Sequence, residues 1–94
     1  MIYKIKFTPI SNKEWKKLDL TIIKQFKTKL EKIIQNPRIP KNKLSGYENI
    51  YKIKLRNSGF RLTYEVKDEQ IVVLVLSVGK RENNKVYNNL KDRI

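Results

Sequence analysis

The sequence contains no histidine and no cysteine, and these two absences exclude several familiar kinds of site. Without cysteine there is no disulfide framework and no thiolate nucleophile, which fits the cytoplasmic location that we expect. Without either residue type a typical zinc site is excluded and a transition-metal site is disfavoured, so we expect no metal and no cofactor. The longest apolar run, Ile71 to Leu76, is far too short to cross a bilayer, and we expect no signal peptide.

Acidic residues are scarce, with 9 against 22 lysines and arginines, which gives a net charge of +13. A surplus of this size favours a nucleic-acid partner over an anionic membrane or an acidic protein. Residues 1–46 hold 12 basic and 3 acidic side chains, a net +9, whereas residues 47–94 hold 10 and 6, a net +4. We infer that the first half supplies long-range electrostatic docking and the second half the local chemistry.

Alternating side chains in the second half predict strands. The segment from Tyr51 to Arg56 alternates strictly between apolar and basic residues, as a half-buried strand does. Three consecutive cations on its outer face are unusual because aligned like charges repel, and they suggest a polyanion site. The sequence predicts four strands, at 2–7, 50–56, 60–66 and 71–78, of which the last is apolar on both faces and therefore central in the sheet.

Two helices are predicted between the first and second strands. Ser11 and Glu14 fit a capping box at the start of a short helix. Asp19 can cap a longer helix that ends before Pro37. The apolar residues of this helix recur at helical spacing: Ile22, Ile23, Phe26, Leu30, Ile33 and Ile34.

A last helix is predicted from Asn83 or Asn84 onward, with Tyr87 at the edge of its apolar stripe. The resulting order is β-α-α-β-β-β-α. It predicts an α+β fold, in one domain spanning residues 1–94, in which a small and mainly antiparallel sheet carries helices on one face.

Several segments resemble the RelE family of bacterial and archaeal toxins. They are Lys13 to Leu18, Asn36 to Arg38, Lys43 to Gly46, Tyr51 to Leu62, Val78 to Glu82, and Val86 with Tyr87. The resemblance spans nearly the whole chain with almost no need for gaps. It implies the compact RelE-type sheet fold and a messenger-RNA endonuclease that acts in the ribosomal A site. It also implies an acidic RelB-like antitoxin that wraps and neutralises the toxin.

In that family the functional set is two strand lysines, an arginine on the next strand, an arginine after the last strand and a tyrosine in the final helix. The corresponding residues here are Lys52, Lys54, Arg61, Arg81 and Tyr87. We expect further contacts with messenger or ribosomal RNA from other basic residues: Arg56, Lys80, Lys43, Lys13, Lys16 and Lys17.

This set can cut RNA without histidine if the 2′-hydroxyl of the RNA itself attacks the adjacent phosphorus. Repulsion between neighbouring lysines favours loss of a proton from one of them, and we take Lys54 as the base and Lys52 as the stabiliser, although the sequence does not decide between the two. Arg61 would hold a phosphate, and Arg81 would face the developing charge and the leaving oxygen. Tyr87 would stack on a splayed base with its hydroxyl near the 2′-oxygen.

Plainer interpretations stand beside these. The strand cations could serve only to prevent edge-to-edge aggregation, and Arg61 could pair with Glu65. Tyr87 could be a core tyrosine, and the lysines of the first two helices could form a solvated face. Two other functions stay open: a ParE-like toxin that inhibits DNA gyrase, whose family generally lacks this lysine pair with both arginines, and a noncatalytic RNA-binding protein.

Overall fold

The computed structural model describes residues 2–55 and 58–80. In chain order the elements are β1 (Lys4–Phe7), α1 (Pro9–Lys16), α2 (Leu20–Ile33), the 3-10 helix η1 (Pro40–Asn42), β2 (Ile50–Lys54), β3 (Phe60–Lys67) and β4 (Val72–Lys80). The predicted order is confirmed over these residues, with η1 added in the connector before β2. The predicted last helix lies outside the described residues. No helix within the described ranges is both long enough and apolar enough to cross a membrane.

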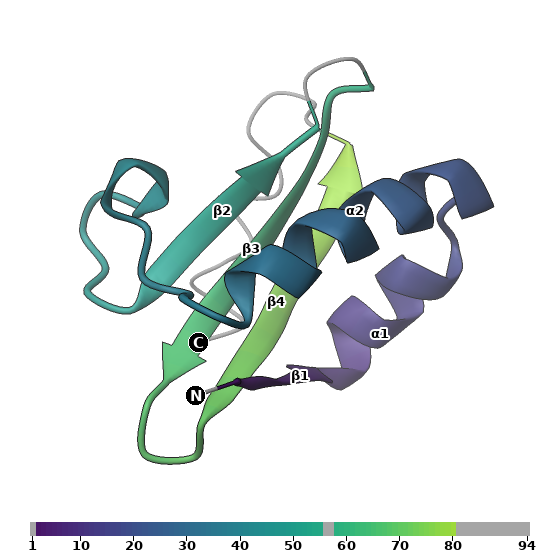
Figure 1. Ribbon diagram of the computed structural model, residues 1–94. Helices are drawn as coiled ribbons and strands as arrows, with labels where there is room; N and C mark the ends of the chain where they lie inside the picture. The colour runs from purple at the N-terminus through teal and green to yellow at the C-terminus, as the bar shows by residue number, and fades with distance from the viewer. Residues whose placement is uncertain (1, 56–57, 81–94) are drawn as a thin grey trace.

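The four strands form one sheet in the order β1-β4-β3-β2, and α1 and α2 cover one of its faces (Figure 1). β2, β3 and β4 form the predicted antiparallel meander. β1 runs parallel to β4, with Lys4 opposite Val72 and Phe7 opposite Val75. β4 is therefore an interior strand, as its apolar sequence predicted, while β1 and β2 are the edges.

The alternation of side chains along the strands divides the hydrophobic core between the two faces of the sheet. The larger cluster lies between α2 and the sheet, and a smaller one on the opposite face is centred on Ile50 and Leu76. Burial of a large apolar side chain contributes about 1.5–3 kcal/mol, so α2 is held mainly by its apolar stripe. Five side chains of the larger cluster have no exposed surface: Phe26, Leu62, Tyr64, Val73 and Val75.

The start of α1 differs from the predicted capping box. Thr8 is the N-cap, its hydroxyl accepts a hydrogen bond from the backbone N of Ser11 at 3.1 Å, and a proline follows at the first helical position. Ser11 therefore lies inside the helix, where its hydroxyl donates to the carbonyl oxygen of Val75 at 2.7 Å. Glu14 Oε1 accepts from the backbone N of Val78 at 3.2 Å. The two residues predicted to cap the helix instead fasten α1 to β4.

α2 begins and ends close to the predicted positions. Asp19 is the N-cap residue, although its side chain makes no capping hydrogen bond. The helix ends at Ile33, ahead of Pro37. Tyr64 reaches this segment from β3, and its buried hydroxyl donates to the carbonyl oxygen of Pro37 at 2.9 Å. Burial raises the pKa of Tyr64, and the nearby Tyr51 adds to this effect, so the phenol stays protonated and keeps donating.

Arg38 joins the connector after α2 to the turn between β3 and β4. Its Nη2 lies 2.6 Å from Asp68 Oδ2 and donates to Asn49 Oδ1 at 3.0 Å. The Tyr3 hydroxyl donates to the other carboxylate oxygen, Oδ1, at 2.7 Å. Hydrogen bonds from Arg38 and then from Tyr3 hold the pKa of Asp68 below its usual value. This network links the N-terminal strand, the connector and the turn.

Candidate functional site

Two of the expected catalytic residues stand on the edge strand β2, on the face away from α2. Lys52 and Lys54 flank Ile53, which is 4% exposed and belongs to the larger core cluster. Lys54 is exposed and Lys52 is half-buried. The strict alternation predicted for this strand is confirmed over its described residues.

Lys54 lies directly opposite Arg61 of β3. In the next pair the backbone N of Leu55 donates to the carbonyl oxygen of Phe60 at 2.9 Å. Because hydrogen-bonded and non-hydrogen-bonded pairs alternate, Lys54 and Arg61 form a non-hydrogen-bonded pair, in which the Cα atoms lie only about 4.5 Å apart. Like charges directly opposite each other destabilise a sheet, and an anion bound beside both would offset this cost. Lys54 and Arg61 each also have interaction partners in the structure. We call Lys52, Lys54 and Arg61 the basic cluster.

Arg61 differs from the two lysines because it is buried, with 7% of its surface exposed. An arginine is almost never buried without partners, and Arg61 does have interaction partners in the structure. Glu65, the partner suggested by the plainer interpretation, lies four residues further along β3, about 13 Å away at the usual rise of a strand. The ion pair of Glu65 is with Lys67, whose Nζ lies 3.8 Å from Glu65 Oε1.

A buried pair of hydroxyl groups lies next to the basic cluster, and the sequence reasoning missed it. Thr63 of β3 stands opposite Lys52 on one side and opposite Ser77 of β4 on the other. The Thr63 and Ser77 hydroxyls are hydrogen-bonded to each other. The register shifts after Thr63, which leaves Leu76 as the extra residue of a β-bulge. The available signal was Ser77, which interrupts the apolar sequence of β4, together with a small hydroxyl residue in β3, Thr63.

The other residues expected to contact RNA are spread over the surface. Lys43 forms an isolated bridge with Tyr51, next to β2, and Lys80 ends β4 opposite Phe60. Both lysines are exposed. The structure thus places Lys43 beside β2, the edge strand of the basic cluster. Lys80 lies on β4, two strands away from β2 in the sheet.

The lysines at α1 lie apart from the basic cluster. α1 contacts β4 and β1, on the side of the sheet order away from β2. The exposed lysines on α1 or at its C-cap are Lys13, Lys16 and Lys17. Three further expected residues lie outside the described ranges: Arg56, Arg81 and Tyr87.

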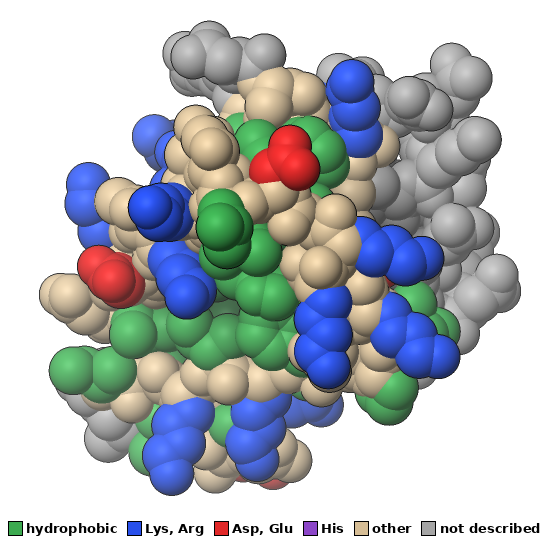
Figure 2. Space-filling model, turned by 90° about the vertical axis from the view of Figure 1, so that its right-hand side faces the viewer, with side chains coloured by type: hydrophobic (Ala, Val, Ile, Leu, Met, Phe, Trp, Pro, Cys, Tyr) green, Lys and Arg blue, Asp and Glu red, His purple; other side chains and the backbone are tan. Residues whose placement is uncertain are grey.

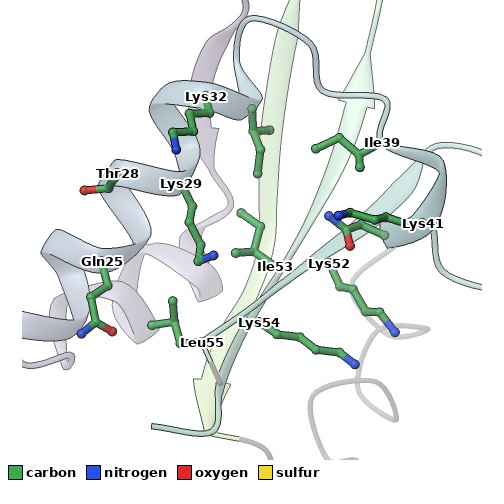
Figure 3. A pocket seen from close by; sticks show the side chains of 12 residues that line it. Gln25, Thr28, Lys29, Lys32, Ile39, Lys41, Lys52, Ile53, Lys54 and Leu55 are labelled. Atoms are coloured by element: carbon green, nitrogen blue, oxygen red, sulfur yellow. The ribbon is translucent and has the colours of Figure 1, made fainter. Parts of the chain in front are cut away.

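A groove of about 1040 Å³ opens between α2, η1 and β2 (Figure 3). Ile33, Ile53 and Leu55 lie at its base and are already 95% buried or more. Among the described residues that line it, none is acidic. Five are lysines, and we call the site the five-lysine groove: Lys29, Lys32, Lys41, Lys52 and Lys54.

A second, more apolar cleft of about 330 Å³ lies between α1, α2 and β1. Trp15 lines it and contacts Phe7, with ring centroids 5.2 Å apart. Figure 2 shows the side of the molecule on which α1, α2 and β1 lie. A hollowed apolar band crosses this side, and the charged side chains around it are mostly basic. Within residues 2–55 and 58–80, no three acidic side chains gather closely enough to hold a metal ion.

Comparison with known proteins links this arrangement to a toxin family. A family model described as the ParE toxin of type II toxin–antitoxin system, parDE, matches residues 5–85. The mRNA interferase toxin RelE of Escherichia coli strain K12 is 50% identical to this chain over 94 residues, which cover 100% of this chain and 99% of that protein.

Two solved structures of the E. coli toxin resemble the fold closely. An arginine double mutant of toxin RelE in the free state superposes with a TM-score of 0.92 and 49% identity, covering 100% of this chain and 99% of that chain. A chain of the intact E. coli RelBE toxin–antitoxin complex superposes with a TM-score of 0.83 and 51% identity, covering 86% of this chain and 99% of that chain.

Proposed function

Because this chain belongs to the RelE family of type II toxins and is a close homologue of the E. coli mRNA interferase RelE, we propose that it cleaves messenger RNA in the ribosomal A site and so inhibits translation. The observation that carries the proposal is the full-length similarity to a protein named as an mRNA interferase. The opposed cations of β2 and β3 support it independently, because they favour a polyanionic ligand.

The reaction that suits these residues is an internal transesterification of RNA. The 2′-oxygen attacks the adjacent phosphorus, the bond from phosphorus to the 5′-oxygen breaks, and the products are a 2′,3′-cyclic phosphate and a 5′-hydroxyl. The enzyme has to align the attack, remove the 2′-hydroxyl proton, stabilise the added charge and return a proton to the leaving oxygen.

We assign these tasks to the basic cluster together with Arg81 and Tyr87. Lys54 takes the proton of the 2′-hydroxyl, and Lys52, two residues away on the same strand face, stabilises the transition state. Arg61 holds a phosphate through the two parallel donors of its guanidinium. Since Arg61 is 7% exposed, this contact requires that its guanidinium becomes more accessible when RNA binds. Arg81 stabilises the developing charge and the leaving 5′-oxygen, which takes its proton from water, while the proton taken by Lys54 passes to solvent. Tyr87 stacks on a displaced base.

Dependence on the ribosome follows from the weakness of this set as proton-transfer groups. Lysine and tyrosine side chains exchange protons less readily near neutral pH than histidine does, so the rate of cleavage depends strongly on how well the RNA is positioned. A ribosome that holds the codon in the required geometry supplies this positioning. We therefore propose that the protein acts in the cytoplasm and docks on ribosomal RNA with its surplus positive charge. The residues proposed for these contacts are Arg56, Lys80, Lys43, Lys13, Lys16 and Lys17.

We also propose an acidic, RelB-like antitoxin as the protein partner. The intact E. coli complex contains a toxin together with its antitoxin. A net charge of +13 would attract an acidic segment, and this attraction would weaken as salt is added. The cleft between α1, α2 and β1 offers partly exposed Ile5, Phe7 and Trp15 to the apolar side of a bound helix. Elsewhere on the toxin, carboxylates of the antitoxin would lie near Arg61 or Arg81.

The match to a model named for ParE keeps inhibition of DNA gyrase as the second candidate function. One experiment separates the two functions. The chain is expressed alone, message ends are mapped by primer extension, and DNA supercoiling by gyrase is measured with the purified protein. We expect cuts inside codons of translated regions and unchanged supercoiling. Equal cutting of untranslated RNA would refute the ribosome dependence, and binding to ribosomes without any cutting would indicate a noncatalytic RNA-binding protein.

A further inference from the structure

We propose that the part of the five-lysine groove formed by Lys29, Lys32 and Lys41 binds the phosphate backbone of ribosomal RNA, next to the place where the message is cut. The proposal rests on the proposed function, because it takes the ribosome as the particle that is bound. Lys52 and Lys54 belong both to the groove and to the basic cluster, and their side chains extend from β2 away from α2 (Figure 3). The lysines that belong to the groove alone are Lys29, Lys32 and Lys41.

The charge of the groove points to a polyanion. Lys29 and Lys32 are three residues apart and therefore share one side of α2. Lys41 comes from η1 on the opposite wall, and its ammonium group is directed into the groove, as is that of Lys29 (Figure 3). No acidic residue in the described lining offsets these charges. Cations held on separate elements gain most from a ligand with repeated negative charge, and contacts with RNA phosphates are strengthened by the release of counterions.

The floor of the groove favours RNA over a protein helix. Ile33, Ile53 and Leu55 are 5%, 4% and 5% exposed, so an apolar helix face placed there would remove little further surface from water. Ile39 is the more exposed apolar lining residue. What the groove offers to a ligand is therefore mostly ammonium and polar groups.

The lining also indicates which RNA is bound. No aromatic side chain is among the described lining residues, so unpaired bases of a message have no surface on which to stack. Structured RNA is contacted through its phosphates and sugars, which suits a groove lined by lysines. α2 covers the face of the sheet opposite the basic cluster. An RNA held by α2 and η1 is therefore a different segment from the message that is cut. We assign this RNA in the groove to the ribosome.

The test compares two triple variants that remove the same charge from different places, so that each carries +10 instead of +13. The groove variant replaces the three lysines outside the basic cluster: Lys29→Gln, Lys32→Gln and Lys41→Gln. The control variant replaces three exposed lysines that do not line the groove: Lys4→Gln, Lys6→Gln and Lys24→Gln. A third variant carries arginine at the three groove positions and keeps the charge.

Affinity for purified ribosomes without message is measured over a salt series. Each lost phosphate contact reduces the slope of log affinity against log salt by about 0.7–0.9. We expect the slope of the groove variant to fall by about 2 to 3 and that of the control variant by less than about 1. The arginine variant should bind like the wild type. On programmed ribosomes saturated with toxin, cleavage by the groove variant should stay within about threefold of wild type, because docking is then no longer limiting.

Equal losses of slope in the groove and control variants would overturn the proposal, as would an unchanged slope in the groove variant. It is also overturned if the groove variant binds empty ribosomes normally but cuts slowly at saturation, because the groove would then hold the message. Normal ribosome binding together with lost affinity for an acidic antitoxin peptide would assign the groove to a protein. If wild type cuts no message while the slopes differ as expected, the proposed function fails and the docking site stands.

Discussion

Replacement of Thr63 by valine is expected to destabilise the fold by about 1–3 kcal/mol, because it leaves the Ser77 hydroxyl buried without its partner. Thr63 is 0% exposed and Ser77 is 1% exposed, so water cannot replace the missing hydrogen bond without entering the sheet. For a chain of 94 residues, each 1 kcal/mol lowers the Tm by about 4–8 °C. The single variant should therefore melt at least about 4 °C below its parent.

The double variant Thr63→Val with Ser77→Ala shows whether the lost stability comes from the broken hydrogen bond or from changed packing. When both partners become apolar no buried polar group is left unpaired, so the double variant should be more stable than the sum of the single effects by about 1 kcal/mol or more. The assay is urea unfolding followed by circular dichroism, in a parent chain that carries Arg81→Ala so that expression does not arrest the host. The dependence of the free energy of unfolding on urea should be equal in all variants.

Two results would refute this reasoning. If Thr63→Val changes the free energy of unfolding by less than about 0.3 kcal/mol, the hydroxyl pair is not a buried, mutually satisfied unit. If the single effects add in the double variant, the two hydroxyls do not depend on each other.

Other variants test the catalytic residues and the network of Arg38, Asp68 and Tyr3. Arg81→Ala should slow single-turnover cleavage on programmed ribosomes by at least ~100-fold, because the charge that it stabilises exists mainly in the transition state. Tyr87→Phe should keep most of this rate while Tyr87→Ala loses it, which shows that stacking outweighs the hydroxyl. Raised pH should partly restore cleavage by Lys54→Ala and leave Lys52→Ala unchanged, as a pH–rate profile would show. Because the pKa of Asp68 is lowered in the fold, its contribution to stability is complete above the unfolded-state pKa of about 4 and is lost as pH falls through the lower folded value. Urea unfolding of wild type and Asp68→Asn from pH 7 to pH 2 should therefore show a difference that closes in acid.

The strands were predictable from sequence because their buried residues recur at a period of two on a face that has to be covered. The alternation around Ile53 located β2 and oriented both lysines. The apolar run ending at Val78 identified β4 as interior. The position of Arg61 directly opposite Lys54 depends on the length of the β2–β3 hairpin, and the bulge at Leu76 depends on pairing with β3. Register across two strands is a tertiary property, so the hydroxyl pair beside the basic cluster was missed.

The start of α1 shows how a local motif can mislead. Ser11 and Glu14 have the spacing of a capping box, but the proline after Thr8 is better suited to the first helical turn and holds the preceding residue extended. The helix therefore begins earlier, and both polar side chains are free to bond to β4. The lysines of α2 were difficult for the opposite reason, since Lys29 and Lys32 have no sequence signal beyond a solvated face. Only the opposing wall, formed by η1 and β2, turns them into one side of a groove.

The parallel pairing of β1 with β4 also affects how the toxin is made. Lys4 pairs with Val72, so 68 residues (72 minus 4) must be added after Lys4 before its partner has been synthesised. At about 5–20 residues per second this takes roughly 3–14 s. β4 is also the last of the described strands to be made, and it is the partner of both β1 and β3. A chain released before β4 is complete therefore has only the β2–β3 hairpin to hold Arg61 opposite Lys54, and an isolated hairpin is at best marginally stable in water. Prematurely terminated products should be harmless to the ribosomes that make them.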